Sequence, residues 1–364
     1  MLPLPAPTRH GRAAVVIGLL CATLAACSSS PSDAEPDTDT QSPTGPSRPD
    51  SSVDPASVPG MGEPSSDLCE GEEFTIGLDI YSDSDSTSTA NIASFERVAE
   101  SMGCVDTIVL VDNADPITAL QNVQSLIQQQ VDAVVLGQVV AAAQPGLMDA
   151  LDAAGIPAVS MYITADGATF VNPSNTDSGL LAGRTLAEAF AKTSSEQPYV
   201  ISGVFPDAGA ASVERMGGFV DGVQEIIGDL PADHILEIDT KADPPTANAQ
   251  TKSVLARIPE GAQILFSGVN DVVTYAMLQG ILESGRGDDA LGIGYGADPT
   301  GIEFVCSNEQ YFGSVAFFPE NTFDYVIPVA LAAVRGQPIP AEVKTPIDVL
   351  NRENSADLYP DDAC

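Results

Sequence analysis

Strand-like and helix-like segments alternate along this chain from Phe74 to Val334, and this alternation constrains the fold more than any other feature. Apolar runs of strand length, such as FTIGLDIY at 74–81, are followed by segments with apolar residues at helical spacing. Strands that alternate with helices form parallel βαβ units with right-handed crossovers. About 300 residues follow the N-terminal region, enough for two domains of ordinary size, so we predict an α/β fold with two lobes.

The segment 264–278, ILFSGVNDVVTYAML, indicates where such a fold places polar side chains. A short apolar run precedes the polar pair Asn270 and Asp271, and apolar residues at helical spacing follow, which predicts a buried strand, a loop and a helix. Ligands of open α/β sheets bind outside the carboxyl ends of the strands. Asn270 offers a donor and an acceptor to a ligand, and Asp271 could cap the helix. The alternative is that both residues merely start the helix.

The N-terminus has the pattern of a secretory signal. A basic start with Arg9 and Arg12 precedes an apolar run at 13–26, which is shorter than the roughly twenty residues of a membrane-spanning helix. The end of this run, Leu-Ala-Ala-Cys at 24–27, resembles the lipobox of bacterial lipoproteins. The resemblance implies that residues 1–26 are a lipoprotein signal peptide and that Cys27 is acylated. The alternative is an ordinary signal with a chance cysteine.

Residues 27–68 are rich in Ser, Pro, Asp, Thr and Gly and are nearly free of large apolar side chains. Such a segment cannot bury enough apolar surface to offset the entropy that ordering removes. We therefore predict a disordered acidic tether that lets the folded part stand off the membrane.

The chain is strongly acidic, with 14 Lys and Arg against 51 Asp and Glu and a formal net charge of -37. Loss of Arg9 and Arg12 with the signal makes the mature chain still more negative. Nucleic acid is excluded as a partner, because phosphate binding needs clustered positive charge. An acidic surface keeps a secreted protein soluble and also suits a saline habitat, and the composition does not separate these two explanations.

The cysteines predict disulfides outside the cytoplasm. Cys21 leaves with the signal and Cys27 takes the lipid. Four cysteines then remain: Cys69, Cys104, Cys306 and Cys364. An even number indicates two disulfides, for which three pairings are possible. The spacings lack the close pairs of a zinc site, so no metal site is predicted.

Five segments of the folded region carry a resemblance to a known family. They are GIPAVSM at 155–161, SNTDSGLLAG at 174–183, AGAASVERMGGF at 208–219, FSGVND at 266–271 and IGYGADP at 293–299. In order and spacing they resemble the sugar-binding, ribose- and galactose-like branch of the type I periplasmic binding proteins, the substrate receptors of ABC transporters. The resemblance covers about residues 74–351.

The resemblance implies two Rossmann-like lobes, each a doubly wound parallel sheet, joined by a hinge with three crossings. The crossings are expected near Pro173, Phe318 and Thr345. The N-terminal lobe would comprise residues 69–173 and 318–344, and the C-terminal lobe residues 174–317 and 345–364. A ligand would be enclosed between the lobes as they close.

This division of the chain favours one disulfide pairing. Cys69 and Cys104 fall in one lobe, and Cys306 and Cys364 fall in the other. Pairs within each lobe leave the hinge free, whereas pairs between lobes would lock the motion that such a receptor uses.

The resemblance also implies a set of polar ligand-binding residues. Asn270 matches a ligand-contacting Asn of the family. Asp83 and Asp85 lie in the loop after the first strand and could accept sugar hydroxyls, although a solvated acidic loop is the alternative. Gln138 and Asp298 follow later strands and complete the polar candidates.

The charged residues that clamp a pentose or hexose in relatives are largely missing. Tyr162 and Ile163 stand where relatives have an Asp-Arg pair, Val213 stands for an Arg, and Gly296 stands for an Asp. Bidentate charged hydrogen bonds give such sites their specificity, so their loss indicates a different ligand. The candidates are a less polar or larger sugar derivative, a polyol, a nucleoside-like molecule or a signalling compound.

Aromatic rings could supply stacking surfaces in place of the charged clamp. Tyr81, Tyr162 and Phe317 are the candidates. The alternative for each ring is packing in the core.

No catalytic residue or cofactor is predicted. Once the signal is removed, the remaining histidine is His234, which stands just before a predicted strand. The chain has no G-x-S-x-G elbow and no phosphate loop, and its glycines at 292, 294 and 296 have the wrong spacing for a dinucleotide fingerprint.

The sequence thus predicts an extracytoplasmic solute-binding lipoprotein of an ABC importer. It would be a monomer, anchored to the cell membrane through Cys27, that closes on a sugar or sugar-like molecule and delivers it to a membrane permease. One alternative is a ligand-sensing lipoprotein that docks on a membrane signalling receptor. Another is a structural surface lipoprotein with an empty cleft.

Overall fold

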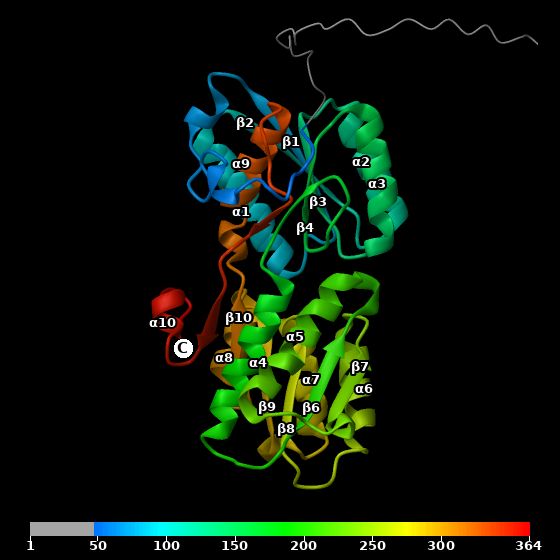
Figure 1. The fold of residues 1–364 in the computed structure, drawn as a ribbon, viewed down its shortest axis with the longest axis vertical. Coiled ribbons are helices and arrows are strands. Elements are labelled where there is room, and N and C mark those ends of the chain that lie inside the picture. Colours follow the sequence, from blue (N-terminus) through cyan, green and yellow to red (C-terminus); the bar gives the residue numbers. More distant parts are fainter. Residues whose placement is uncertain (1–46) are drawn as a thin grey trace, which may run out of the picture. The chain divides into compact units, whose positions relative to one another are not determined.

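The computed structural model describes residues 47–364 (Figure 1). The predicted signal peptide, the lipidation site at Cys27 and the first part of the predicted tether lie outside the described residues. The described chain forms two six-stranded sheets with helices on their faces, which confirms the predicted α/β fold with two lobes.

The sheet of the N-terminal lobe has the order β11-β5-β4-β3-β1-β2, and all its pairings are parallel. Its strands are β1 (Phe74–Ile80), β2 (Val105–Val111), β3 (Ala133–Gly137), β4 (Ala158–Met161), β5 (Thr169–Asn172) and β11 (Glu342–Lys344). Its helices are α1 (Ser86–Met102), α2 (Pro116–Gln128), α3 (Gln144–Ala154) and α9 (Phe323–Val334).

Both faces of this sheet are covered. Ala133 and Val135 of β3 pack in the cluster that contains α1 and α9, whereas Val134 and Leu136 pack in the cluster that contains α2 and α3. Successive side chains of a strand point to opposite faces, so a strand buried on both faces reads as a continuous apolar run.

The sheet of the C-terminal lobe has the order β12-β10-β9-β8-β6-β7, and only the β10–β12 pair is antiparallel. Its strands are β6 (Tyr199–Val204), β7 (Ile235–Asp239), β8 (Ile264–Gly268), β9 (Ala290–Gly296), β10 (Tyr311–Ala316) and β12 (Asp348–Asn351). Its helices are α4 (Asn175–Ala191), α5 (Ala210–Ile227), α6 (Pro244–Leu255), α7 (Asp271–Glu283), α8 (Pro299–Ser307) and α10 (Ser355–Leu358).

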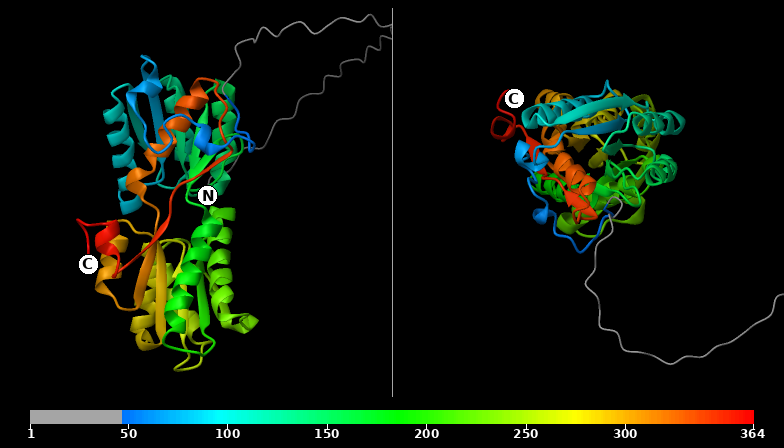
Figure 2. Two further views of the ribbon diagram at one scale, coloured as in Figure 1. Left: turned by 60° about the vertical axis from the view of Figure 1, so that its left-hand side comes forward. Right: turned by 90° about the horizontal axis from the view of Figure 1, so that it is seen from above.

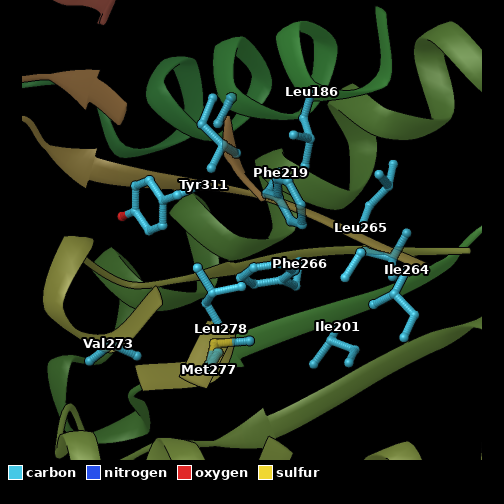
Figure 3. Packing of buried hydrophobic residues seen from close by; sticks show 14 of the residues in the cluster. Leu186, Ile201, Phe219, Ile264, Leu265, Phe266, Val273, Met277, Leu278 and Tyr311 are labelled. Atoms are coloured by element: carbon cyan, nitrogen blue, oxygen red, sulfur yellow. The ribbon is translucent and has the colours of Figure 1, made fainter. Parts of the chain in front are cut away.

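One large apolar cluster forms the core of this lobe. Figure 3 shows side chains of α4, α5 and α7 meeting those of β8, among them Leu186, Phe219, Met277 and Phe266. The central position of β8 buries all five of its residues and brings its carboxyl end to the middle of the sheet edge.

The chain passes between the two sheets three times, at 173–174, at 317–322 and at 345–347. These positions coincide with those expected for a three-crossing hinge. Figure 2 shows the last crossing, in red, as an extended segment between the two lobes. Three short strands, β5, β11 and β12, were not predicted, because strands of three or four residues leave little pattern in a sequence.

Polar side chains begin most of the helices that follow strands. Asp85, Asp115, Ser174, Asp243 and Asn270 each accept a hydrogen bond from a backbone N–H in the first turn of α1, α2, α4, α6 and α7, respectively. Such caps satisfy donors that have no partner within the helix. The expectation that Asp271 caps α7 is wrong, because Asn270 does so.

Residues 47–68 depart from the predicted disordered tether. The Asp50 amide donates to the backbone carbonyl oxygen of Ile339 (3.0 Å), and the Gly62 amide donates to the backbone carbonyl oxygen of Asp324 (3.0 Å). Val58 is buried in the core beside α9. The few apolar side chains of this segment cannot order it alone, but the N-terminal lobe offers them a surface on which to pack.

Both favoured disulfides are present. Cys69 pairs with Cys104 in the N-terminal lobe, and Cys306 pairs with Cys364 in the C-terminal lobe. Neither bond joins one lobe to the other, so neither restrains the three crossings.

Candidate functional site

The carboxyl ends of the strands in the two lobes face each other across the hinge. The clearest sign is a hydrogen bond from the Thr87 hydroxyl, in the first turn of α1, to Oδ2 of Asp298, at the start of α8 (2.8 Å). Thr87 belongs to the N-terminal lobe and Asp298 to the C-terminal lobe. The polar residues beside these two side chains therefore form the candidate site.

Two tyrosines line the N-terminal side of this site. The rings of Tyr81 and Tyr162 meet edge to face, with their centroids 5.4 Å apart. The Tyr81 hydroxyl donates to Oδ1 of Asp85 (2.9 Å), and Nδ2 of Asn91 donates to the Tyr162 hydroxyl (2.9 Å). Burial raises the pKa of both phenols, so both stay protonated at neutral pH.

Tyr162 has an unusual backbone conformation, with a φ of 65°. A bulky residue rarely occupies this left-handed region, and it costs free energy there. The Tyr162 amide donates to Oδ1 of Asn172 (3.2 Å), which holds the turn after β4 in place. This turn ends β4, and the Tyr162 ring that follows it packs against Tyr81.

Gln138 is buried within the N-terminal lobe, at 1% exposure. Its Nε2 donates to Oδ2 of Asp79 (2.8 Å) and to Oδ2 of Asp112 (2.6 Å). Nδ2 of Asn122 donates to the other oxygen of Asp79 (2.8 Å). Both N–H groups of Gln138 are thus used inside the lobe, which differs from the expectation that Gln138 contacts a ligand.

The two carboxyl groups beside Gln138 have perturbed titrations. Burial raises the pKa of Asp79 to about 8, and the nearby Asp112 carboxyl adds to the rise. Burial also raises the pKa of Asp112. No Lys, Arg or His within residues 47–364 forms an ion pair with either carboxyl, so one proton shared by the pair lowers the cost of burying them.

Asp298 and Asp271 lie together on the C-terminal side. Oδ1 of Asp298 caps α8 by accepting from the amides of Thr300 and Gly301 (3.0 Å each). The Asp271 carboxylate accepts from the Tyr311 hydroxyl (2.7 Å), among other donors. Burial raises the pKa of Asp271 to about 7, and the charge of Asp298 contributes to the rise.

Asn270 is exposed at the end of β8. Its Oδ1 accepts from the Val273 amide (2.9 Å) and caps α7. Its Nδ2 makes no hydrogen bond to residues 47–364, so this donor is free to meet a ligand. The structure thus supports both readings of Asn270, since one side-chain atom starts the helix and the other remains available.

Phe317 and Arg215 lie where the second crossing leaves the C-terminal lobe. The Arg215 guanidinium stacks on the Phe317 ring (4.9 Å) and on the Tyr295 ring (5.4 Å). It donates to the carbonyl of Val269 (2.6 Å) and to Oδ1 of Asn175 (2.7 Å). Burial lowers the pKa of Arg215 to about 10, which still leaves it charged at neutral pH.

Asp83, the remaining candidate, is exposed in the loop after β1. A separate cavity of about 240 Å³ at the second and third crossings is lined by Phe317, Phe318, Tyr325 and Thr345 and by three neighbouring residues. Of the candidate residues, this cavity includes only Phe317.

Sequence reasoning did not single out Thr87, Ser88, Asn91 or Arg215, which lie beside the candidate residues. Asp85 was expected in the loop after the first strand, whereas it caps α1, which already begins at Ser86. The available signal was Asp85 followed by the run STST, since Asp caps helices readily. Asp271 was singled out with Asn270 as a polar pair at a strand end, but its buried partners Ala297, Tyr311 and Ser314 are distant in the chain and could not be found from the local pattern.

Two α/β lobes with polar strand ends between them and an uncrosslinked hinge are typical of proteins that enclose a small molecule between lobes. A family model described as a periplasmic binding protein domain matches residues 76–338, and the chain belongs to this family. Its members are solute-binding proteins and not enzymes, as predicted. A search of curated protein sequences gave no match.

Solved structures share the fold. One is an ABC transporter periplasmic solute binding protein from Actinobacillus succinogenes 130z with bound D-allose, with 20% identity over 78% of this chain and 100% of that chain and a TM-score of 0.68. A second is an ABC transporter solute binding protein from Bacillus halodurans C-125 with bound myo-inositol, with 19% identity over 79% and 98% of the chains and a TM-score of 0.68. A third, from Mycobacterium smegmatis with bound glycerol, has 19% identity over 79% and 96% and a TM-score of 0.68.

The described residues also set two limits. No helix within 47–364 has the length and apolar character needed to cross a membrane. In the same range no cluster of three or more His, Cys, Asp or Glu side chains is arranged to hold a metal ion.

Proposed function

We propose that this protein is the extracytoplasmic solute-binding lipoprotein of an ABC importer, and that its lobes close on a sugar or sugar-like molecule and present it to a membrane permease. The observation that carries the proposal is the Thr87–Asp298 contact between the lobes, which brings two sets of polar strand ends together. The quoted solved structures hold a sugar or polyol and are named as parts of ABC transporters. They favour transport over docking on a signalling receptor.

The proposed ligand contacts come from both lobes. Tyr81, Asp83, Asp85 and Tyr162 would meet the ligand from the N-terminal lobe. Asn270, Asp298 and Phe317 would meet it from the C-terminal lobe. A ligand held by both sets stabilises the closed arrangement more than the open one, and this difference in affinity drives closure.

Thermal unfolding of the purified protein against sugars and polyols tests the proposal. A ligand at a hundred times its dissociation constant adds about 2.7 kcal/mol to the free energy of unfolding, which raises the midpoint by several degrees. If no sugar or polyol on a broad panel shifts the midpoint, the proposed function is wrong.

The Asn270→Asp variant tests whether the ligand binds at Asn270. This change keeps the cap of α7 but removes the free N–H donor, so the midpoint shift caused by the ligand should shrink. Asp243→Asn is the matched control, because it exchanges the cap of α6 in the reverse sense, away from the candidate contacts, and should leave the shift intact.

Anchoring through Cys27 is part of the same proposal. A lipidated Cys27 would hold the protein on the membrane through its acyl chains. The Cys27→Ala variant should then appear in the medium or the soluble fraction, while the parent chain stays with the membranes.

A further inference from the structure

Three side-chain oxygens at the N-terminal end of α1 are buried without a hydrogen-bond partner among the described residues. They are Oδ2 of Asp85, Oγ of Ser88 and Oδ1 of Asn91. Residues three apart lie on the same face of a helix, so these oxygens belong to one patch. Ser88 is 0% and Asn91 2% exposed. Buried acceptors without donors are rare and costly, which indicates that a group with several donors belongs here.

The patch adjoins the contact between the two lobes. Thr87 lies between Asp85 and Ser88 on the same turn and donates to Asp298 of the opposite lobe. The Tyr81 hydroxyl binds the other oxygen of the Asp85 carboxylate, and the amide nitrogen of Asn91 binds the Tyr162 hydroxyl. The hydroxyl ends of the two tyrosines therefore adjoin this patch.

The charge of this patch is not balanced by the protein. No Lys, Arg or His within residues 47–364 forms an ion pair with Asp85 or with Asp298. Arg215, the guanidinium of the candidate site, is turned to Val269 and Asn175 of its own lobe. Two carboxylates thus approach the ligand space, and a matching positive charge is missing.

We propose that the ligand carries a protonated amine on a hydroxylated framework, as in an amino sugar or an amino polyol, and that Asp85, Ser88 and Asn91 hold its ammonium group. This inference rests on the proposed function and narrows its ligand class. An ammonium group offers three donors to three acceptors, whereas a sugar hydroxyl offers one.

Calorimetric titration of the full protein with matched ligand pairs tests this inference. Each pair joins a neutral sugar with its amino counterpart, such as glucose with glucosamine and galactose with galactosamine, at one ionic strength. We expect the amino member of at least one pair to bind about tenfold tighter or more, since ion pairing in a water-excluded site is strong.

Two variants test whether Asp85 causes the preference for the amino member of each pair. Asp85→Asn keeps the cap of α1, because Asn caps as well as Asp, but removes the charge, so the preference for the amine should fall to about twofold or less. Asp115→Asn makes the same exchange at the cap of α2 and should keep the preference.

The outcomes separate the two proposals. Equal or tighter binding of the neutral members overturns the amine inference and leaves the proposed function standing. A preference that survives in Asp85→Asn also overturns the inference, because the amine is then bound elsewhere. Failure of every neutral and amino sugar on the panel overturns the inference and the proposed function together.

Discussion

Asp79 is a carboxyl group that folding moves from water into the interior of the N-terminal lobe. Its folded pKa of about 8 lies above the ordinary value of 3.8, because burial disfavours the charged form. Between pH 3.8 and about pH 8 the folded protein therefore holds a proton that the unfolded chain has already released. The stability that this group contributes is complete below about pH 4 and is lost as the pH rises through about 8.

The Asp79→Asn variant should make stability less dependent on pH. Between about pH 5 and pH 9 the unfolding midpoint of the parent protein should fall more than that of the variant, because the amide cannot ionise. Thermal unfolding at several pH values measures both slopes. Part of the slope should remain in the variant, since Asp271 titrates in the same window, with a pKa of about 7.

An exposed aspartate provides the control for this prediction. Asp106 lies on β2, next to the strand of Asp79, and is exposed. Asp106→Asn should reproduce the pH slope of the parent protein. Equal slopes for Asp79→Asn and the parent would contradict a shared proton at Asp79.

Helices α4 and α5 approach each other unusually closely through glycines. A Cβ on Gly183 of α4 would lie 2.1 Å from the carbonyl oxygen of Phe219, and one on Gly179 would lie 2.1 Å from that of Arg215. Backbone atoms cannot move aside as a flexible side chain can. This contact sets the position of Arg215, and so it supports the wall of the candidate site.

The Gly183→Ala variant should destabilise the protein by about 1–3 kcal/mol, because the added methyl group forces the two helices apart. Chemical denaturation measures the loss. Gly217→Ala, on the open side of α5, is the control. It should stabilise the helix by roughly 0.5–1 kcal/mol, since Ala has the higher helix propensity. A Gly183→Ala protein as stable as the parent would contradict the close packing.

The two lobes are joined by three crossings and by side-chain contacts between them. Thr87 donates to Asp298, and Lys344 of β11 pairs with Asp177 of α4 (2.9 Å) near the third crossing. The Lys344–Asp177 pair is exposed, so salt and water screen it. The Thr87–Asp298 bond is the more protected of the two contacts and should bias the protein toward closure.

The Thr87→Val variant should shift the lobes toward an open arrangement while preserving the shape of the side chain. Loss of one hydrogen bond of about 0.5–1.5 kcal/mol should weaken ligand binding by roughly two- to tenfold. Small-angle scattering should report a larger radius of gyration without ligand. Thr89→Val is the control, because the Thr89 hydroxyl bonds only to nearby carbonyl oxygens. Unchanged affinity and size in Thr87→Val would contradict the prediction.

The order of helices and strands follows from local patterns. Buried parallel strands such as β8 give continuous apolar runs, and caps such as Asn270 mark where helices begin, so both can be recognised from neighbouring residues. The assignment to two lobes and the disulfide pairing needed the family resemblance in addition. The short strands β5, β11 and β12 exist only because longer strands beside them supply partners.

The sequence by itself determined the alternation of strands and helices, the polar residues at the strand ends and the acidic character of the chain. The tertiary structure decided which of those residues meet. It placed Gln138 between two buried carboxyls, turned Arg215 into its own lobe and set Thr87 against Asp298. These contacts join residues far apart in the chain, and their strength depends on burial and geometry, which no local pattern of residues records.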